Sequence, residues 1–396
     1  MSANNTEASV FADEQDTDIE AFARLCEQSA DVRDYPRAST VERGVVIYDR
    51  LAFELDSALE RRGLMAELNR VFSTGPGIVV VRGSFVDTTV LDRHTAVFKR
   101  IMADESEVRT AGDHFAAAGA NTRVWNSVQK VAEVDPAAFI EYYANPVMHT
   151  LSEAWLGPHY QVTAQVNVVH PGGQAQQPHR DYHLGFQTNE AAARYPLAVH
   201  RLSPLLTLQG AVAHTDMPIE SGPTQLLPFS HQYELGYLAW RQDAFKRYFA
   251  EHAVQLPLNK GDQLFFNPAL FHAAGDNRTR DQHRMANLLQ VSSVFGVPME
   301  TVDRTMMTLA IYPELLRQVQ AGSLTGTELS GVIATVADGY SFPTNLDTDP
   351  PVNGLAPQTG QQVLAQALEE AWSLDRLRRV MADKASQRRA SQLPPF

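Results

Sequence analysis

The sequence predicts a mainly β fold, an antiparallel sandwich or barrel, with flanking helices before and after it. Three observations support this prediction. Between residues 160 and 296, short apolar or alternating runs are punctuated by Pro, Gly, Asn and Asp, which is typical of antiparallel strands and turns. On either side, apolar residues recur three to five positions apart, as on one face of a helix. A chain of 396 residues that is 44% hydrophobic also buries a full core, which excludes disordered, collagen-like and coiled-coil classes.

Composition and charge narrow the function classes. Lys and Arg total 33 against 46 Asp and Glu, a net charge of −13, which argues against an extended phosphate-binding surface and a nucleic-acid partner. Cys26 is the single cysteine, so neither an intrachain disulfide nor a thiolate zinc cluster can form. We find no secretory signal and no run of about 18 apolar residues that would span a membrane. We therefore expect a cytoplasmic protein that acts on a small molecule and has no membrane partner.

The chain divides into an arm and one domain. Residues 1–40 are acidic with few large apolar side chains, so we expect a weakly ordered N-terminal arm with one helix around Asp18–Gln28. Residues 41–396 form a single domain. Its β core covers about residues 160–296, and its helical flanks are 41–159 and 297–396.

The elements of this domain follow in chain order. In the first flank, helical spacing covers Arg50–Phe72 and Pro136–Leu156, and Asp87 can cap a helix that runs through Ile101. Between them, the β-branched run Ile78–Val81 predicts a buried strand. The last flank predicts helices at Thr301–Gln320 and Gln361–Lys384, joined by an irregular loop. The strands expected in the β core are Tyr160–Val169, Leu205–Ala213, Thr224–Leu227, Val254–Leu258, Gln263–Phe266 and Leu288–Phe295.

Two histidines are followed by an acid two positions later, which is the spacing of a metal site on an extended segment. In His179-Arg180-Asp181 both side chains lie on one face, because strand side chains alternate with period two. A distant His272, delivered by a turn and a strand, completes two histidines and one carboxylate, the facial set that binds Fe(II) and leaves positions open. The pair His214 and Asp216 is the competitor that spacing alone does not dismiss.

An arginine follows the last of these candidate ligands. Arg284 comes twelve residues after His272 and opens the apolar run Met285–Val291. A guanidinium at this point suits a bidentate clamp on a dicarboxylate that reaches the metal. Arg278 and Arg280 are nearby, but they fall in a turn where arginines are usually solvated.

Three linked segments resemble the phytanoyl-CoA dioxygenase family, which comprises iron(II)- and 2-oxoglutarate-dependent oxygenases. They are Gln165–Asp181, Ser221–His231 and His272–Arg284, in the same order as in that family. The resemblance implies a double-stranded β-helix (jelly-roll, cupin-like) core, with Fe(II), 2-oxoglutarate and dioxygen bound to it. It implies His179, Asp181 and His272 as metal ligands and Arg284 as the 2-oxoglutarate clamp. Phe229 stands where the family usually has Gly.

The family resemblance also implies a reaction. We expect a dioxygenase that hydroxylates an unactivated C–H bond of a small organic substrate, with oxidative decarboxylation of 2-oxoglutarate to succinate and CO₂. An acid at Asp181 disfavours halogenation. The ends of the chain match the family less well, so the substrate, the choice between hydroxylation and desaturation, and the oligomeric state stay open.

Further polar residues are candidates for cofactor or substrate contact. Thr224, Gln165, Asn167 and Gln209 lie on strands expected to line the barrel, where each contacts the cofactor or makes a structural hydrogen bond. Tyr182 and His183 adjoin the metal motif, and His183 shares its face only if no turn follows Asp181. Trp125, next to Asn126, is a candidate lid residue. All three are candidate substrate contacts.

Two rival functions have different chemistry. The first is a non-oxidative binding protein that keeps the jelly-roll fold. The second is a cupin-like metalloenzyme that does not use 2-oxoglutarate, in which Arg284 has no role in the reaction.

Overall fold

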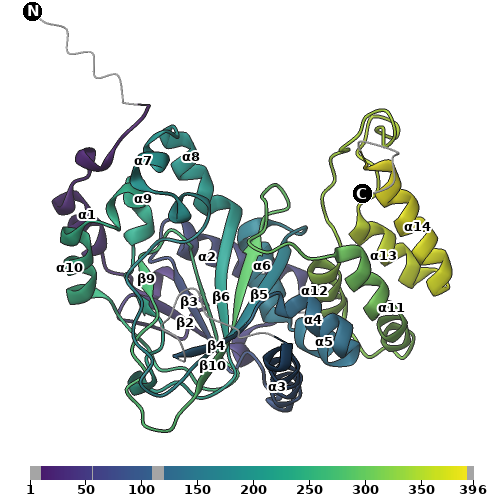
Figure 1. Ribbon diagram of the computed structural model, residues 1–396, viewed down its shortest axis with the longest axis horizontal. Helices are drawn as coiled ribbons and strands as arrows, with labels where there is room; N and C mark the ends of the chain where they lie inside the picture. The colour runs from purple at the N-terminus through teal and green to yellow at the C-terminus, as the bar shows by residue number, and fades with distance from the viewer. Residues whose placement is uncertain (1–9, 56, 109–119, 390–396) are drawn as a thin grey trace, which may run out of the picture.

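The computed structural model describes residues 10–55, 57–108 and 120–389, and a large mixed sheet forms its centre (Figure 1). The strand order is β1-β2-β3-β8-β6-β10-β5-β4, and neighbours pair antiparallel except for the parallel pair β2 and β3. The strands are β1 (Thr40–Glu42), β2 (Val45–Asp49), β3 (Ile78–Arg82), β4 (Asn121–Val124), β5 (Gln161–Val169), β6 (Thr207–Ala213), β8 (Gln263–Phe266) and β10 (Arg284–Ser292).

A second, smaller sheet pairs β7 (Gln225–Leu226) with β9 (His272–Ala273). Isolated bridges extend it on both sides, from His179 to His272 and from Leu226 to Val254. One cavity is lined by residues of both sheets, so it lies between them. This arrangement confirms the predicted jelly-roll core.

Alternation along the central strands separates the cavity from the hydrophobic core. On β10, Arg284, Ala286, Leu288 and Gln290 line the cavity, whereas the intervening Met285, Leu289 and Val291 belong to the main buried cluster. On β5, Gln165 and Asn167 likewise face the cavity, and the residues between them face the core. The period of two in a strand therefore turns one series of side chains, which carries the polar site residues, toward the cavity and the alternate series toward the helices.

Helices cover the outer face of the large sheet and share its main buried cluster. The predicted helix at 136–156 is two helices, because Pro146 has no N–H and the Asn145 side chain caps the second one through Val147 and Met148. The predicted helix at 361–384 is also two, separated by Ala371 at a φ of 48°. The helices are α2 (Ala58–Ser73), α3 (Thr89–Val108), α4 (Ser127–Val134), α5 (Pro136–Tyr143), α6 (Pro146–Leu156), α11 (Arg304–Gln320), α12 (Gly326–Val336), α13 (Gly360–Glu369) and α14 (Leu374–Gln387).

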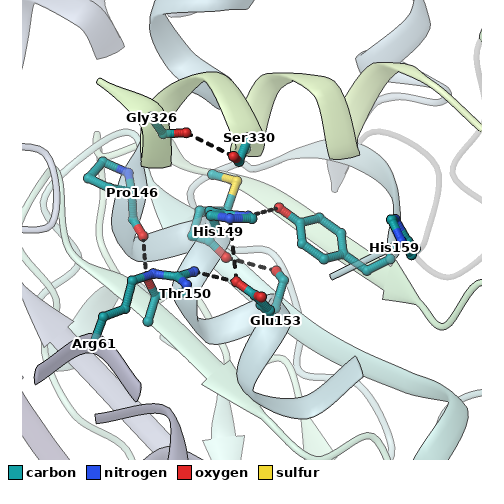
Figure 2. Close-up of polar contacts among 12 residues, drawn as sticks. Arg61, Pro146, His149, Thr150, Glu153, His159, Gly326 and Ser330 are labelled. Carbon is teal, nitrogen blue, oxygen red and sulfur yellow. Dashed lines mark hydrogen bonds and ion pairs between the residues drawn. The ribbon is translucent and has the colours of Figure 1, made fainter. Parts of the chain in front are cut away.

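A polar network joins α2 and α6 beneath α12. Figure 2 shows Arg61 and His149 both directed at Glu153, with Arg61 Nη2 at 2.5 Å and His149 Nε2 at 3.5 Å from its Oε2. His149 Nδ1 lies 2.8 Å from the hydroxyl of Tyr160, which precedes β5. Burial lowers the pKa of His149 to about 4, with the Arg61 charge acting in the same direction and Glu153 opposing them. The network ties the helical layer to the sheet through a neutral imidazole.

The helix predicted around Asp18–Gln28 is present, but it is not part of a weakly ordered arm. Residues 1–9 lie outside the described residues, but in residues 10–40, expected to be weakly ordered, α1 (Ile19–Cys26) packs beside α10 (Asp243–His252) (Figure 1). Phe22 is fully buried, and its ring lies 4.9 Å from that of Phe271 and 5.1 Å from that of Phe245. Composition missed this anchor because one aromatic side chain among acidic residues is enough to fix a short helix. Three further short helices lie on the same side: α7 (Asn189–Ala193), α8 (Leu197–Leu202) and α9 (Gly236–Ala239).

The β structure also extends beyond the predicted core of about 160–296. The flank at 41–159, expected to be helical apart from one strand, supplies β2, β3 and β4 to the large sheet, and β1 begins at Thr40. The predicted strand Val254–Leu258 forms only single bridges at its two ends. Among the described helices, none has both the length and the apolar character needed to cross a membrane.

Candidate metal centre and cosubstrate cavity

Three side chains from two segments meet at one edge of the cavity. His179 lies in the extended stretch that bridges to β9, and His272 opens β9 itself. Asp181 lies between them, with Oδ1 at 3.5 Å from His179 Nε2 and Oδ2 at 3.4 Å from His272 Nε2. One ligand atom from each of the three falls within 4.8 Å of the others. The backbone pairing of the two segments therefore brings together the two histidines and one carboxylate proposed as ligands from the sequence.

The second nitrogen of each imidazole is used to orient the ring. His179 Nδ1 lies 2.9 Å from the Gln177 carbonyl oxygen, and His272 Nδ1 lies 2.8 Å from that of Leu270. Because a carbonyl only accepts, both Nδ1 atoms carry the proton and donate, which leaves both Nε2 lone pairs free for a metal. Burial lowers the pKa of His179, against the raising effect of Asp181, and so favours the neutral imidazole that ligates.

The carboxylate of Asp181 is held in its charged form. Burial alone raises its pKa, but the imidazoles of His179 and His272 and the amide of Gln209 outweigh it and hold the pKa below its usual value. Gln209 Nε2 donates to Oδ2 of this carboxylate. Gln209, a predicted cofactor residue, therefore acts on a ligand of the candidate metal centre.

Arg284 is at the far end of the same cavity. It is 7% exposed, and its Nη1 donates to the Ser221 carbonyl oxygen at 3.0 Å. Burial lowers the pKa of Arg284 to about 10, and within the described residues no carboxylate forms an ion pair with it. A buried guanidinium without a counter-ion is costly, so it favours an anion from outside the chain.

The cavity measures about 330 Å³ and brings most of the predicted site residues together. The ligand set, Arg284, Thr224, Gln165, Asn167, Gln209 and Trp125 all line it. Asn167 Oδ1 and Gln209 Oε1 are buried without a hydrogen-bond partner among the described residues. The roles of these residues in cofactor binding stay predictions, but their placement on one cavity is a feature of the structure.

Tyr182 and His183, the other two predicted substrate residues, do not line the cavity. Both have positive φ, 72° and 36°, so the chain turns immediately after Asp181 and the alternation that would place His183 beside it ends there. The Tyr182 hydroxyl instead bonds to Ser292 Oγ at 2.9 Å and accepts from Met299 N at 3.3 Å. His183 Nδ1 lies 3.0 Å from Ser203 Oγ. Tyr182 and His183 therefore make structural hydrogen bonds outside the cavity instead of the predicted contacts with substrate.

The competing pair does not form a metal site. His214 is buried, and both of its ring nitrogens have partners, Tyr142 Oη at 2.9 Å and Thr95 Oγ1 at 2.8 Å. Asp216 is exposed and accepts from Lys260 N at 2.8 Å. The strand β6 ends at Ala213, so the two residues are not on one extended face.

Phe229, at the position where the resemblance leads us to expect Gly, has a φ of 66°. This left-handed conformation is the one that Gly adopts without strain and that a bulky residue rarely adopts. Phe229 is 3% exposed, so its burial offsets the conformational cost. The departure from the family pattern is thus accommodated without a change of backbone.

Sequence reasoning did not single out several cavity residues with polar or aromatic side chains, among them Arg123, Phe186, Gln290 and Glu300. Gln290 could have been predicted from the sequence, because a period of two counted from Arg284 along β10 reaches that position. Phe186 ends a four-residue 3-10 helix and Glu300 lies on an irregular segment, and both are too short to give a periodic signal. Arg123 lies on β4, and the polar residues of this short segment do not form a pattern that predicts a strand.

The residues present fit iron and 2-oxoglutarate. Two imidazoles and one carboxylate are a ligand set suited to Fe(II) with open positions. The uncompensated Arg284 guanidinium, on the same cavity, matches the distal carboxylate of a dicarboxylate.

Comparison with known proteins agrees with this geometry. The phytanoyl-CoA dioxygenase family model matches residues 74–286, more than half of the chain, and the chain therefore belongs to that family. This family comprises iron- and 2-oxoglutarate-dependent oxygenases, so iron and 2-oxoglutarate are the cofactors that membership supports.

Individual relatives are distant. The dioxygenase trt7 of Aspergillus terreus is 29% identical over 177 residues, which cover 42% of this chain and 56% of the relative. The iron/alpha-ketoglutarate-dependent dioxygenase ausU of Aspergillus calidoustus is 28% identical over 181 residues, covering 42% of this chain and 54% of the relative. The matches thus span about half the length of these curated relatives. Among solved structures, the carbocyclase SnoK from nogalamycin biosynthesis has a TM-score of 0.43 at 19% identity, covering 59% of this chain and 86% of that one.

Proposed function

We propose that this protein is a dioxygenase that hydroxylates an unactivated C–H bond of a small organic substrate and converts 2-oxoglutarate into succinate and CO₂. One observation carries the proposal: the candidate iron ligands and the uncompensated Arg284 lie on a single cavity. A metal site alone would fit many hydrolases, and an arginine alone would fit many anion sites. Together they fit a metal bound beside a dicarboxylate.

The residues have separable tasks in this reaction. His179, Asp181 and His272 would hold the iron, and Gln209 keeps the Asp181 carboxylate oriented. Arg284 would bind the far carboxylate of 2-oxoglutarate, with Thr224 beside it on the cavity wall. Bound iron, with 2-oxoglutarate and dioxygen, supplies the oxidising chemistry.

The cavity walls support the same reaction. The strands β6, β8 and β10 contribute apolar side chains that exclude water from the substrate side, namely Ala211, Leu264, Phe266 and Leu288. Excluding water protects a reactive oxidant from side reactions. The names of the curated relatives, dioxygenases of several fungi, also support an oxygenase.

The test follows succinate and product together. Purified protein is supplied with Fe(II), 2-oxoglutarate, air and a mixture of small metabolites, and succinate is quantified while products are screened for a gain of one oxygen atom. We expect iron-dependent succinate release that is lost in His179→Ala and Asp181→Ala. His252→Ala is the matched control, because His252 is exposed on α10 and does not line the cavity.

The same assay separates the rival functions. A binding protein would release no succinate under any condition. A cupin-like metalloenzyme would consume substrate with iron but without 2-oxoglutarate, and Arg284→Ala would leave its rate unchanged. Either result would overturn the proposal.

A further inference from the structure

The cavity has a second polar end, opposite Arg284. Strand β10 places Arg284, Ala286, Leu288 and Gln290 in one row along it, so Gln290 lies six positions after Arg284. At a rise of about 3.3 Å per residue, these two positions lie on the order of 20 Å apart along the strand. The loop that follows β10 brings Glu300 to the Gln290 end, where it also lines the cavity. One end is thus suited to 2-oxoglutarate, and the other end is left for the substrate.

Glu300 is fixed in place by its surroundings. Its Oε1 accepts a hydrogen bond from the backbone N–H of Asn126 at 2.8 Å. The preceding residue, Met299, donates its N–H to the Tyr182 hydroxyl at 3.3 Å, and Gln165 Nε2 lies 3.6 Å from Met299 Sδ. Tyr182 directly follows the candidate ligand Asp181, so this wall of the cavity is held in register with the metal centre.

Acceptor atoms without donors collect at this end. Glu300 Oε2 and Gln290 Oε1 are both buried and have no hydrogen-bond partner among the described residues. Buried polar atoms are normally paired, and leaving them unpaired is costly. The arrangement therefore favours a ligand that offers a hydrogen-bond donor.

The charges at this end indicate that the donor is uncharged. Burial raises the pKa of Glu300 to about 7, with the Asn126 N–H and the Lys130 charge opposing it. Arg123 lines the same cavity, bonds to Gln165 Oε1 at 3.2 Å, and lies over the Trp125 ring at 5.3 Å. Because burial favours the uncharged form of the Glu300 carboxyl, this end favours an uncharged donor over a cation. Its remaining walls are apolar, formed by Trp125, Phe186, Leu288 and Met299.

We propose that Glu300 and Gln290 bind a hydroxyl group of the substrate, so that the substrate class is a small uncharged alcohol or phenol on an apolar skeleton. This assignment rests on the proposed function in one respect, namely that the cavity holds a substrate beside 2-oxoglutarate. It makes Glu300 a specificity-determining residue rather than a ligand of the metal.

The test measures binding without turnover. Protein loaded with Fe(II) and saturating 2-oxoglutarate, with dioxygen excluded, is titrated calorimetrically with four probes on one skeleton: 3-phenyl-1-propanol, propylbenzene, 3-phenylpropylamine and 3-phenylpropanoate. We expect the alcohol to bind roughly tenfold more tightly than propylbenzene, the effect of one hydrogen bond, and more tightly than either charged probe. Glu300→Ala should abolish this preference.

Two further variants make the result specific. Glu300→Gln keeps an acceptor oxygen and should retain the preference for the alcohol, which also shows that the cavity is still folded. Glu369→Ala, an exposed change on α13, is the matched control and should bind the four probes as the wild type does. An alcohol preference that survives in Glu300→Ala would overturn the proposal. The proposal would also be overturned if the amine bound most tightly of the four probes and this tight binding were lost in Glu300→Gln. That result would assign a cationic substrate.

Failure of the proposed function gives a different pattern. If the wild type releases no succinate but shows the Glu300-dependent preference for the alcohol, the oxygenase proposal fails and the recognition site stands. If it releases succinate without that preference, the recognition site is wrong and the oxygenase proposal stands.

Discussion

Gln209 and Asp181 form one hydrogen-bonded unit, in which the amide Nε2 of Gln209 donates to the Asp181 oxygen that lies 3.4 Å from His272 Nε2. Gln209 lies on β6 of the large sheet, whereas Asp181 follows the extended segment of the small sheet. The bond thus connects the two sheets at the candidate metal centre.

Loss of this bond should weaken metal binding without unfolding the protein. We expect Gln209→Ala to reduce metal affinity by about 10- to 100-fold, the usual effect of removing a partner of a metal ligand. Titration with Mn(II) followed by electron paramagnetic resonance measures the effect. Gln358→Ala, an exposed change, serves as the control and should bind Mn(II) normally. Unchanged affinity in Gln209→Ala would contradict the role given to this bond.

Arg284 should determine the affinity for 2-oxoglutarate. Its removal takes away the charged partner of the distal carboxylate, and truncating a buried charge pair costs about 2 to 5 kcal/mol. We expect Arg284→Ala to raise the KM for 2-oxoglutarate steeply, with a smaller effect on metal affinity, and Arg284→Lys to recover part of the loss. Arg280→Ala is the control, since Arg280 is an exposed arginine close by in sequence. If Arg284→Ala and Arg280→Ala had the same KM for 2-oxoglutarate, another residue would have to bind the distal carboxylate.

Phe22 should stabilise the protein although it lies in the acidic N-terminal region. The ring is fully buried among Tyr233, Phe245 and Phe271. Replacing a buried Phe by Ala costs about 3 to 5 kcal/mol, so Phe22→Ala should lower the free energy of unfolding by that order if α1 unfolds with the core. Urea denaturation measures the change against Leu59→Ala, whose side chain is 79% exposed. A loss no larger than that of the control would mean that α1 is not part of the cooperative unit.

His149 should make stability depend on pH in the acid range. Its folded pKa is about 4, below the ordinary histidine value because of burial. Between pH 6.5 and 4 the unfolded imidazole therefore takes up a proton that the folded one does not, so its contribution to stability falls as the pH falls.

A substitution isolates this contribution from that of other histidines. His149→Gln keeps a hydrogen-bonding group near Tyr160 but does not titrate, so its loss of stability from pH 7 to pH 5 should be smaller than that of the wild type. Thermal unfolding at a series of pH values measures the difference, with exposed His252→Gln as the control. If the stability of His149→Gln and of the wild type fell equally between pH 7 and pH 5, the His149 imidazole would not titrate in this way.

Features that depend on neighbouring residues could be predicted from the sequence. The pair His179 and Asp181 could be proposed because extended chains alternate side chains with a period of two. The strand at Ile78–Val81 could be predicted because a β-branched run between glycines favours a buried strand, and the structure has it as β3. The arginine at the start of β10 followed from the same pattern.

Other features depend on contacts that no local pattern encodes. The strands β1 and β2 join the sheet only because β3 pairs in parallel with β2, and α1 is ordered only because Phe22 finds an aromatic pocket made by distant residues. Tyr182 leaves the cavity because the chain turns at positive φ immediately after Asp181.

The sequence by itself determined the family and the jelly-roll core, because three linked motifs in order resemble that family. It predicted the candidate iron ligands, with His214 and Asp216 left open as an alternative pair. The tertiary structure alone decided that Gln209 bonds to Asp181, that His214 is satisfied by Tyr142 and Thr95, and that Glu300 faces the same cavity as Arg284. The physical reason is that pairing between strands and loops far apart in the chain, rather than local periodicity, selects which polar groups meet.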